Sequence, residues 1–323
     1  MVGKNKKEAY FNGNPAAPPH ILPAKPYRIP HPQCRLKPSD GIFNAPEPRF
    51  RQRPMLGAAF AVLPRRRARY NPPRHPPDLG NLPMKPAYFI SDLHLSEKHP
   101  ELTALLLRFL RSSAAGQARA VYILGDLFDF WVGDDEVSEL NTSVAREIRK
   151  LSDKGVAVFF VRGNRDFLIG QDFCRQAGMT LLPDYSVLDL FGCKTLICHG
   201  DTLCTDDRAY QRFRKIVHRK RLQKLFLMLP LKWRTRLAAK IRRVSKMEKQ
   251  VKPADIMDVN AAFTARQVRA FNAERLIHGH THREHIHHEN GFTRIVLGDW
   301  HNDYASILRV DGDGAVFVPL EKY

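Results

Sequence analysis

The chain has 323 residues, 43% of them hydrophobic, which is enough for one large domain or two ordinary ones with a sizeable core. The formal net charge of +19 favours an acidic partner: nucleic acid, an anionic membrane surface or a phosphorylated substrate. The five cysteines form no CxxC pair, which argues against a disulfide scaffold or a cysteine-type zinc finger and favours a reducing cytoplasm. No apolar run approaches the roughly 20 residues of a spanning helix, and the N-terminus does not read as a secretory signal.

Residues 1–83 differ in composition from the rest of the chain. They hold 17 of the 23 prolines, and 15 lysines and arginines against four acids. Proline removes a backbone donor and blocks helices and central strands, so this segment cannot offset the entropy lost on ordering. We expect residues 1–83 to be a disordered extension rich in proline and arginine. Because Met84 directly precedes the first strand pattern, translation from Met84 is the alternative, in which this segment would not be made.

From Ala87 onward, short apolar runs alternate with amphipathic stretches. The predicted strands are Ala87–Ser91, Ala120–Leu124, Val156–Val161, Val187–Leu190, Thr195–Cys198, Arg275–His278, Thr293–Leu297, Ala305–Val310 and Ala315–Val318. The predicted helices lie near Glu101–Arg111, Thr142–Ser152, Asp166–Ala177 and Asp258–Phe271. Alternating strands and helices, followed by hairpins, predict an α/β core with layered sheets.

Residues 208–252 interrupt this alternation with 17 lysines and arginines and one acid, Glu248. Leucines and aromatic residues recur between the charges at helical spacing, and Pro230 divides the pattern. We expect a basic, amphipathic helical cap over residues 207–253, inserted between residues 84–206 and 254–323 of the core. An ordinary solvated helical surface is the alternative interpretation of these charges.

Five short motifs end predicted strands or open turns. They are Asp92-Leu-His94, Gly125-Asp126, Gly163-Asn164-Arg165-Asp166, His199-Gly200-Asp201 and Gly279-His280-Thr281-His282. In a doubly wound fold, such residues converge on one crevice. Seven of their side chains offer oxygen or imidazole donors: Asp92, His94, Asp126, Asn164, His199, His280 and His282. This donor set favours a divalent pair, Mn²⁺ before Fe²⁺, Zn²⁺ or Mg²⁺, with Asp126 as the bridging carboxylate.

Two such ions clamp a phosphoryl oxygen and hold a hydroxide at neutral pH, so the motifs predict in-line attack on phosphorus. No catalytic side chain is needed beyond that hydroxide. The sequence contains neither a GxSxG elbow nor a Walker loop, which argues against an acyl-serine hydrolase and a P-loop ATPase. A second GD pair, Gly298-Asp299, reads as a plain turn, and His285, His287 and His288 read as surface residues.

This order of motifs resembles the calcineurin-like metallophosphoesterase superfamily, whose fold is a sandwich of mixed sheets flanked by helices. The longer strings are similar to those of the UDP-2,3-diacylglucosamine diphosphatases of lipid A biosynthesis: ISDLHLS, ILGDLFDFWVGDD, VRGNRDFLIG, CHGDTLCTDD, IMDVN and IHGHTHR. Arg165 supports the narrower resemblance, because the superfamily commonly has His after GN. The similarity runs from about Pro86 to about Ile307.

The resemblance implies hydrolysis of UDP-2,3-diacylglucosamine at the α-phosphorus, giving UMP and 2,3-diacylglucosamine 1-phosphate (lipid X). It implies two Mn²⁺ per chain, one held by Asp92, His94, Asp126 and His282, the other by Asp126, Asn164, His199 and His280. The implied substrate contacts are Asn164, Arg165, Asp207, Ser245, Lys249, Lys252 and His280. Lys249 stands where the family has Asn, which exchanges an amide for a longer cation that could still bind phosphate. Glu284 replaces the usual Pro after HTHR, which should alter the loop more than the ligands.

The resemblance further implies a cytoplasmic protein, peripheral on the cytoplasmic face of the inner membrane. The basic, apolar cap suits both an anionic membrane surface and the acyl chains of the substrate. Neither a nucleic-acid partner nor an obligate protein partner is expected. Three alternatives remain: a nucleotide or nucleic-acid phosphodiesterase of the same superfamily, a non-enzymatic scaffold with this fold, and a general protein phosphatase. Strong, salt-dependent DNA binding would favour the first, and phosphopeptide hydrolysis the last.

Overall fold

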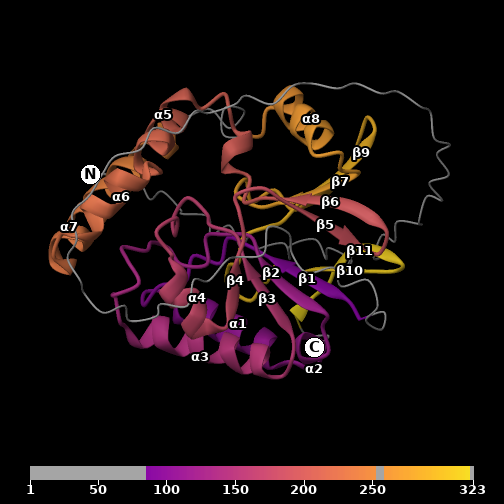
Figure 1. Cartoon of the computed structure of the whole chain (residues 1–323), viewed down its shortest axis with the longest axis horizontal. Helices are drawn as coiled ribbons and strands as arrows, with labels where there is room; N and C mark the ends of the chain where they lie inside the picture. The colour runs from indigo at the N-terminus through magenta and orange to yellow at the C-terminus, as the bar shows by residue number, and fades with distance from the viewer. Residues whose placement is uncertain (1–84, 252–257, 321–323) are drawn as a thin grey trace, which may run out of the picture.

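The computed structural model describes residues 85–251 and 258–320, with side chains up to residue 243 in the first range. The predictions for residues 1–83 and for Lys252 therefore lie outside the described residues. Within the described ranges, the chain forms two β-sheets that pack face to face, with helices on their outer faces (Figure 1).

The first sheet has six strands in the order β11-β10-β1-β2-β3-β4. Its strands are β1 (Ala87–Ile90), β2 (Ala120–Ile123), β3 (Ala157–Phe160), β4 (Met179–Leu181), β10 (Leu308–Asp311) and β11 (Gly314–Phe317). The strands β1 to β4 run parallel, whereas β10 pairs antiparallel with β1 and β11. Because β1 and β2 are buried on both faces, their sequences are continuous apolar runs without alternation.

The second sheet has five strands in the order β5-β6-β7-β9-β8. They are β5 (Ser186–Leu190), β6 (Cys193–Ile197), β7 (Arg275–His278), β8 (His285–Glu289) and β9 (Phe292–Val296). The central strands β6, β7 and β9 are parallel, and antiparallel hairpins flank them on both sides. The predicted mixed sheets flanked by helices are confirmed.

Apolar side chains fill the space between the sheets and the space under the helices. Alternate residues of β1, such as Phe89 and Ile90, belong to these two different cores. Between the sheets, Phe89 stacks on Tyr122 with ring centroids 4.7 Å apart, and Tyr122 stacks on Phe159 at 4.9 Å. The helices α1 (Pro100–Arg111), α2 (Ser113–Gly116), α3 (Glu139–Asp153) and α4 (Gln171–Ala177) lie on the first sheet, and α8 (Ala261–Ala270) lies on the second (Figure 1).

Three consecutive helices lie along one side of the sandwich (Figure 1). These cap helices are α5 (Arg208–Val217), α6 (Lys220–Leu227) and α7 (Leu231–Val251), and they follow the short 3₁₀ helix Asp201–Leu203. The break at Pro230 agrees with the prediction, and a further break falls at His218 and Arg219. Most of the large hydrophobic side chains exposed in the described part of the chain belong to the cap helices.

A buried arginine attaches the cap helices to the sandwich. Arg234 in α7 is only 2% exposed and donates to the carbonyl oxygens of Val132 and Leu229 at 2.7 and 2.9 Å, and to the carboxylate of Asp135. A side chain at Gly133 would collide with this guanidinium, because a Cβ at that position would lie 2.3 Å from Nη1. The loop after β2 and the start of α7 therefore pack closely against each other.

The structure corrects one predicted helix and adds two strands. The helix predicted over Asp166–Ala177 begins only at Gln171. Before it, the carboxylate of Asp166 accepts the backbone N–H groups of Gly163 and Leu127, which favours a loop. The edge strands β4 and β8 were not predicted, because β4 has three residues and β8 carries histidines where an apolar alternation would stand.

Candidate metal centre

The ends of five parallel strands bring the predicted ligands to one edge of the sandwich. Asp92 and His94 follow β1, Asp126 follows β2, and Asn164 follows β3. On the second sheet, His199 follows β6, and His280 and His282 follow β7. Because the two sheets face each other, side chains from both converge here. The seven residues are called the ligand cluster below.

Strained backbone marks this cluster. Within the described ranges, eight non-glycine residues have a positive φ. Five of them are members of the ligand cluster: Asp92, His94, Asp126, His280 and His282. Such conformations cost free energy and persist where the surrounding structure enforces them, as it does at functional sites.

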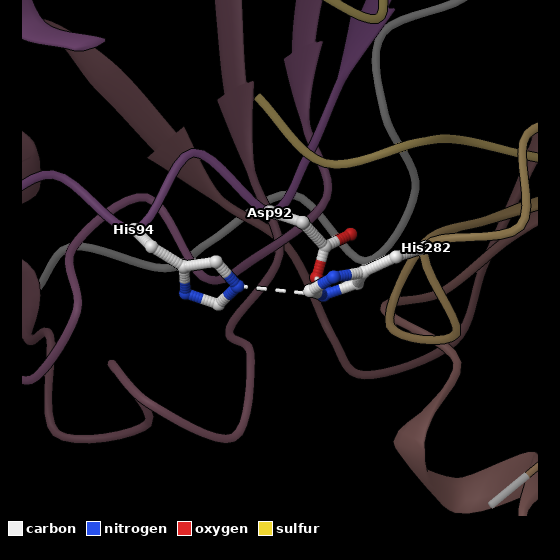
Figure 2. A group of neighbouring side chains, drawn as sticks. All are labelled: Asp92, His94 and His282. Atoms are coloured by element: carbon white, nitrogen blue, oxygen red, sulfur yellow. Dashed lines mark hydrogen bonds and ion pairs between the residues drawn. The ribbon is translucent and has the colours of Figure 1, made fainter. Parts of the chain in front are cut away.

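One half of the cluster contains Asp92, His94 and His282 (Figure 2). His282 Nε2 lies 3.3 Å from Asp92 Oδ1 and 3.4 Å from His94 Nε2. The other Asp92 oxygen, Oδ2, accepts the Ser91 hydroxyl at 2.6 Å and the His280 backbone N–H at 2.9 Å. Among the described residues, Asp92 Oδ1 and His94 Nδ1 are buried without a hydrogen-bond partner. Buried polar atoms that lack a hydrogen-bond partner among carboxylates and imidazoles fit a cation.

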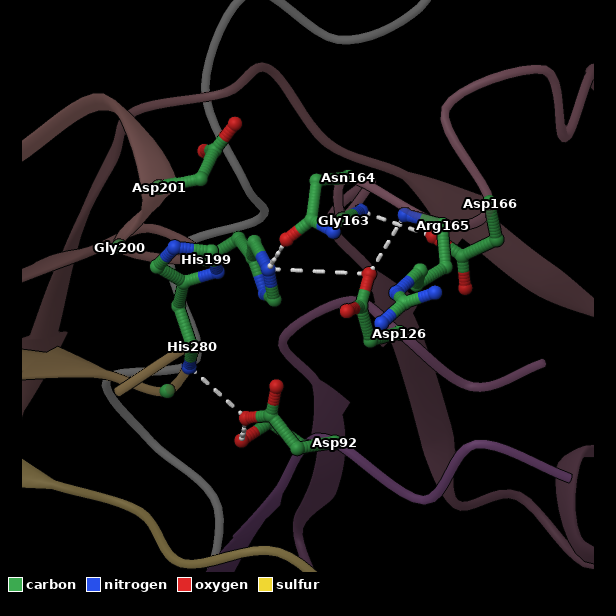
Figure 3. A network of polar contacts seen from close by, with 12 residues as sticks. Asp92, Asp126, Gly163, Asn164, Arg165, Asp166, His199, Gly200, Asp201 and His280 are labelled. Carbon is green, nitrogen blue, oxygen red and sulfur yellow. Dashed lines mark hydrogen bonds and ion pairs between the residues drawn. The ribbon is translucent and has the colours of Figure 1, made fainter. Parts of the chain in front are cut away.

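The other half contains His199, Asn164 and Asp126 (Figure 3). His199 Nδ1 donates to the Leu124 carbonyl at 2.8 Å, so Nε2 is the nitrogen that faces the cluster. That Nε2 lies 3.0 Å from Asn164 Oδ1 and 3.7 Å from Asp126 Oδ1. Burial opposes the charged ring, but the neighbouring carboxylates, Asp126 first, raise the pKa of His199, so this place between oxygen atoms favours a positive charge. A metal ion would supply such a charge, and the carbonyl on Nδ1 orients the ring for it.

Asp126 joins the two halves. Its Oδ2 lies 3.9 Å from His94 Nδ1, and its Oδ1 lies 3.7 Å from His199 Nε2. The backbone N–H of Arg165 donates to Oδ1 at 2.8 Å. The preceding Gly125 has a φ of 85°, and a Cβ there would lie 2.6 Å from Gly163. Glycine at 125 therefore lets the β2 and β3 loops approach each other under this carboxylate.

Burial and charge shift the pKa values of the cluster in opposite directions. Burial opposes ionisation of Asp92, but the hydrogen bond to His282 and the neighbouring histidine charges hold its pKa well below the usual range. Burial lowers the pKa of His280 to about 4. For His282, hydrogen bonds to Asp299 and Asp92 outweigh burial and raise the pKa to about 10. The carboxylate of Asp92 is thus kept charged within an enclosed site, which suits a divalent cation.

Asp166 is not a member of the ligand cluster, but it stabilises the loops that carry two of its members. It is fully buried and accepts the N–H groups of Gly163 at 2.8 Å and Leu127 at 2.7 Å, which fixes the loops that carry Asn164 and Asp126. Burial, followed by the charge of Asp126, raises the pKa of Asp166 to about 7.

The structure brings only some of the predicted substrate contacts to the cluster. Asn164 and His280 are members of it, and Arg165 lies beside it, with Nη1 4.0 Å from Asp129 Oδ1. Arg242 of α7 pairs with the other oxygen of Asp129. Asp207 caps the N-terminus of α5, where it accepts the Tyr210 N–H at 3.0 Å. The side chains of Ser245, Lys249 and Lys252 lie outside the described residues.

Two acidic residues near the cluster had no predicted role. Asp201 is 3% exposed and accepts the Tyr210 hydroxyl and Arg214 Nε, both at 2.6 Å, so it ties α5 to the His199 loop. Asp299 lies 3.4 Å from His282 Nδ1, and its interpretation as a plain turn residue was wrong. The motif His199-Gly200-Asp201 could have indicated a role for Asp201 in the sequence. For Asp299, the preceding Gly298 was the only sequence feature that could have done so.

The two-sheet fold and the cluster of carboxylate and imidazole ligands define a metal-dependent hydrolase. Residues 85–284 match the family model described as calcineurin-like phosphoesterase. Among solved structures, an archaeal phosphodiesterase aligns with 72% of this chain and 99% of its own, at 12% identity and a TM-score of 0.37, which is too distant to bear on activity.

Comparison with curated relatives identifies the group within this family to which the chain belongs. A UDP-2,3-diacylglucosamine hydrolase of Neisseria meningitidis serogroup C is 99% identical over 240 residues, which cover 74% of this chain and 100% of the relative. The enzyme of the same name from Neisseria gonorrhoeae is 94% identical over 74% of this chain and 100% of its own length. The one from Haemophilus influenzae strain Rd is 59% identical over 72% of this chain and 97% of its own length. The chain therefore belongs to the calcineurin-like phosphoesterases and, within them, to the UDP-2,3-diacylglucosamine hydrolases.

Proposed function

We propose that this chain hydrolyses the pyrophosphate of UDP-2,3-diacylglucosamine at the α-phosphorus, releasing UMP and 2,3-diacylglucosamine 1-phosphate in lipid A biosynthesis. The observation that carries the proposal is the pair of buried acceptor groups joined by Asp126. The shared name of relatives up to 99% identical supplies the substrate.

The ligand cluster would hold two Mn²⁺ ions. Asp92, His94, Asp126 and His282 form one ligand set, and Asp126, Asn164, His199 and His280 form the other. Imidazole, carboxylate and amide donors without a thiolate suit Mn²⁺ before softer ions. When bound, such a pair polarises a phosphoryl oxygen and lowers the pKa of water to near neutrality. A nucleophile supplied in this way would make a catalytic serine or cysteine unnecessary.

The residues of the chain bind and orient the substrate. Arg165 is half-buried beside the cluster, so its guanidinium can neutralise the phosphate that Asn164 and His280 also contact. Asp207, Ser245, Lys249 and Lys252 would contact the parts of the substrate nearer the cap helices. Lys249 offers a cation where the family has an amide, and it retains the capacity to bind phosphate.

The cap helices suit a lipid substrate. Leu225, Met228 and Trp233 are 62%, 79% and 66% exposed, and they stand among lysines and arginines of α6 and α7. Exposed apolar side chains next to lysines and arginines suit the binding of diacyl chains and of an anionic membrane surface. We therefore place the protein on the cytoplasmic face of the inner membrane. Among the described residues, no helix has the length and apolarity to cross a bilayer.

The test is hydrolysis of UDP-2,3-diacylglucosamine in the presence of Mn²⁺, with the full chain and with a chain begun at Met84. Release of UMP and the sugar 1-phosphate, abolished by Asp126→Ala, is the expected result. If bis-p-nitrophenyl phosphate is cleaved while the lipid substrate is untouched, the metal centre stands but the proposed substrate fails. Nucleotides and nucleic acid are then the substrates to examine.

A further inference from the structure

Asp299 faces the side of His282 that points away from the ligand cluster. The Oδ2 atom of Asp299 lies 3.4 Å from His282 Nδ1, whereas His282 Nε2 lies 3.3 Å from Asp92 Oδ1. The two nitrogens of one imidazole therefore have different partners. Nε2 faces the acceptors that would share a metal, and Nδ1 faces a carboxylate.

This division of the ring determines which nitrogen can bind a metal. A neutral imidazole that ligates through Nε2 must carry its proton on Nδ1. A carboxylate beside Nδ1 accepts that proton in a hydrogen bond, holds the ring plane and raises the basicity of the ligating nitrogen. Asp299 stands where such an acceptor is needed.

The loop that carries Asp299 is fixed on both sides of this residue. Before it, the Leu297 N–H donates to the His278 carbonyl at 2.7 Å. After it, the Trp300 N–H donates to the Asp92 carbonyl at 3.3 Å, and the Trp300 side chain is 3% exposed within the core. The carboxylate of Asp299 is thereby held in register with both His282 and Asp92.

Glu284, which replaces the usual Pro after HTHR, fastens the two loops together. Its Oε2 accepts the hydroxyls of Tyr304 and Ser306, each at 2.5 Å. Ser306 Oγ in turn accepts the Gly298 N–H at 2.9 Å. A Cβ at Gly298 would lie 3.2 Å from Glu284, so glycine at 298 permits this approach. The Gly298-Asp299 pair thus connects the end of β9 to the His282 loop.

We propose that Asp299 is a positioning residue that orients His282 for metal binding, and that Glu284 stabilises the loop geometry that places it there. The inference rests on the proposed function, because it assigns a role toward the metal pair. It adds a carboxylate outside the seven ligands to the residues that determine metal affinity.

The test measures Mn²⁺ binding to the metal-stripped full-length chain by isothermal titration calorimetry. Asp299→Ala is expected to weaken the affinity of one site by about 10- to 100-fold. Asp299→Asn keeps a neutral acceptor for Nδ1–H and is expected to lose less. Asp303→Ala is the matched control, since Asp303 is an exposed acid on the same loop. Glu284→Ala should give a smaller loss than Asp299→Ala.

A metal titration of activity separates positioning from structural damage. If Asp299 acts through His282, excess Mn²⁺ restores most of the kcat of Asp299→Ala, because the remaining ligands are still in place. Equal Mn²⁺ affinity in wild type and Asp299→Ala, or a loss that excess metal does not restore, would overturn the inference. Absence of Mn²⁺ binding by the wild type would overturn the metal centre itself, a distinguishable failure.

Discussion

The ligand cluster and the cap helices are opposite in their chemistry. In the cluster, polar atoms are enclosed, and Asp92, Asp126 and His199 are at most 2% exposed. In the cap helices, large apolar side chains such as Trp233 are exposed, and the surrounding charge is positive. Polar side chains usually lie at the surface and large apolar ones in the core, and each region departs from this distribution in the opposite sense. The enclosed polar cluster is suited to a cation, and the exposed apolar surface is suited to an apolar partner.

This contrast separates chemistry from recognition. Under the proposed function, the cluster would supply reactivity toward phosphodiesters in general. The cap helices contribute no residue to the cluster among the described residues, so they would supply selectivity for the lipid. Variants in the two regions should therefore differ in the range of substrates they affect.

Asp126→Ala should have the largest effect, because this carboxylate contacts both halves of the cluster. We expect turnover of the lipid substrate and of bis-p-nitrophenyl phosphate to fall together by about 10³-fold or more. Bound Mn²⁺, measured by elemental analysis, should fall as well. Asp303→Ala serves as the control. Retention of either activity would contradict a shared bridging ligand.

Arg234→Ala should detach the cap helices from the sandwich. It leaves the buried carbonyl oxygen of Val132, together with the partners Leu229 and Asp135, without the guanidinium, at a cost of about 1–3 kcal/mol in the free energy of unfolding of this region. Denaturant unfolding followed by intrinsic tryptophan fluorescence, to which Trp233 of α7 contributes, measures this. Arg236→Ala, an exposed arginine on the same helix, is the matched control. Equal midpoints for the two variants would show that Arg234 is not an anchor.

Trp233→Asp should distinguish the two substrates. If the indole contacts lipid, its loss removes roughly 1.5–3 kcal/mol of apolar burial, which corresponds to about 10- to 100-fold in turnover of the diacyl substrate. Hydrolysis of bis-p-nitrophenyl phosphate should stay within about twofold. The ratio of the two rates is the measurement. An equal loss on both substrates would remove the proposed role of the cap helices in lipid recognition.

The smallest effect concerns stability at low pH and lies in the helical layer of the sandwich. Arg111, followed by Lys150, lowers the pKa of Glu147 to about 2 from its ordinary value of 4.5. Since the folded-state pKa is lowered, this contribution is complete above pH 4.5 and is lost as the pH falls toward 2. Glu147→Gln should therefore flatten the decline of melting temperature over this range. Glu139→Gln, an exposed acid on the same helix, should leave the decline unchanged.

The convergence of the seven residues at one edge of the sandwich could be predicted from the sequence, because strand patterns and polar strand ends coincide. The apolar runs before Asp92 and Asp126 identify parallel strands, and parallel strands deliver their ends to one edge. The break of the cap helices at Pro230 followed from proline chemistry in the same way. These features depend on local sequence and a general rule of topology.

The missed features depend on contacts between distant segments. Asp299 reads as a turn residue because its partner His282 is brought to it by pairing of β7 with β9. The start of α4 was misplaced because Asp134, far away in sequence, accepts the N–H groups of Gly170 and Phe173. Neither contact leaves a periodic trace in the sequence. Short edge strands such as β4 carry too few residues to show a pattern.

If the ligand cluster directs water to the α-phosphorus of UDP-2,3-diacylglucosamine, the new oxygen atom enters UMP. Hydrolysis in ¹⁸O-labelled water with Mn²⁺, followed by mass spectrometry of both products, shows where it goes. We expect one ¹⁸O atom in UMP and none in the diacylglucosamine 1-phosphate. Label in the sugar phosphate, or absence of UMP, would contradict this expectation.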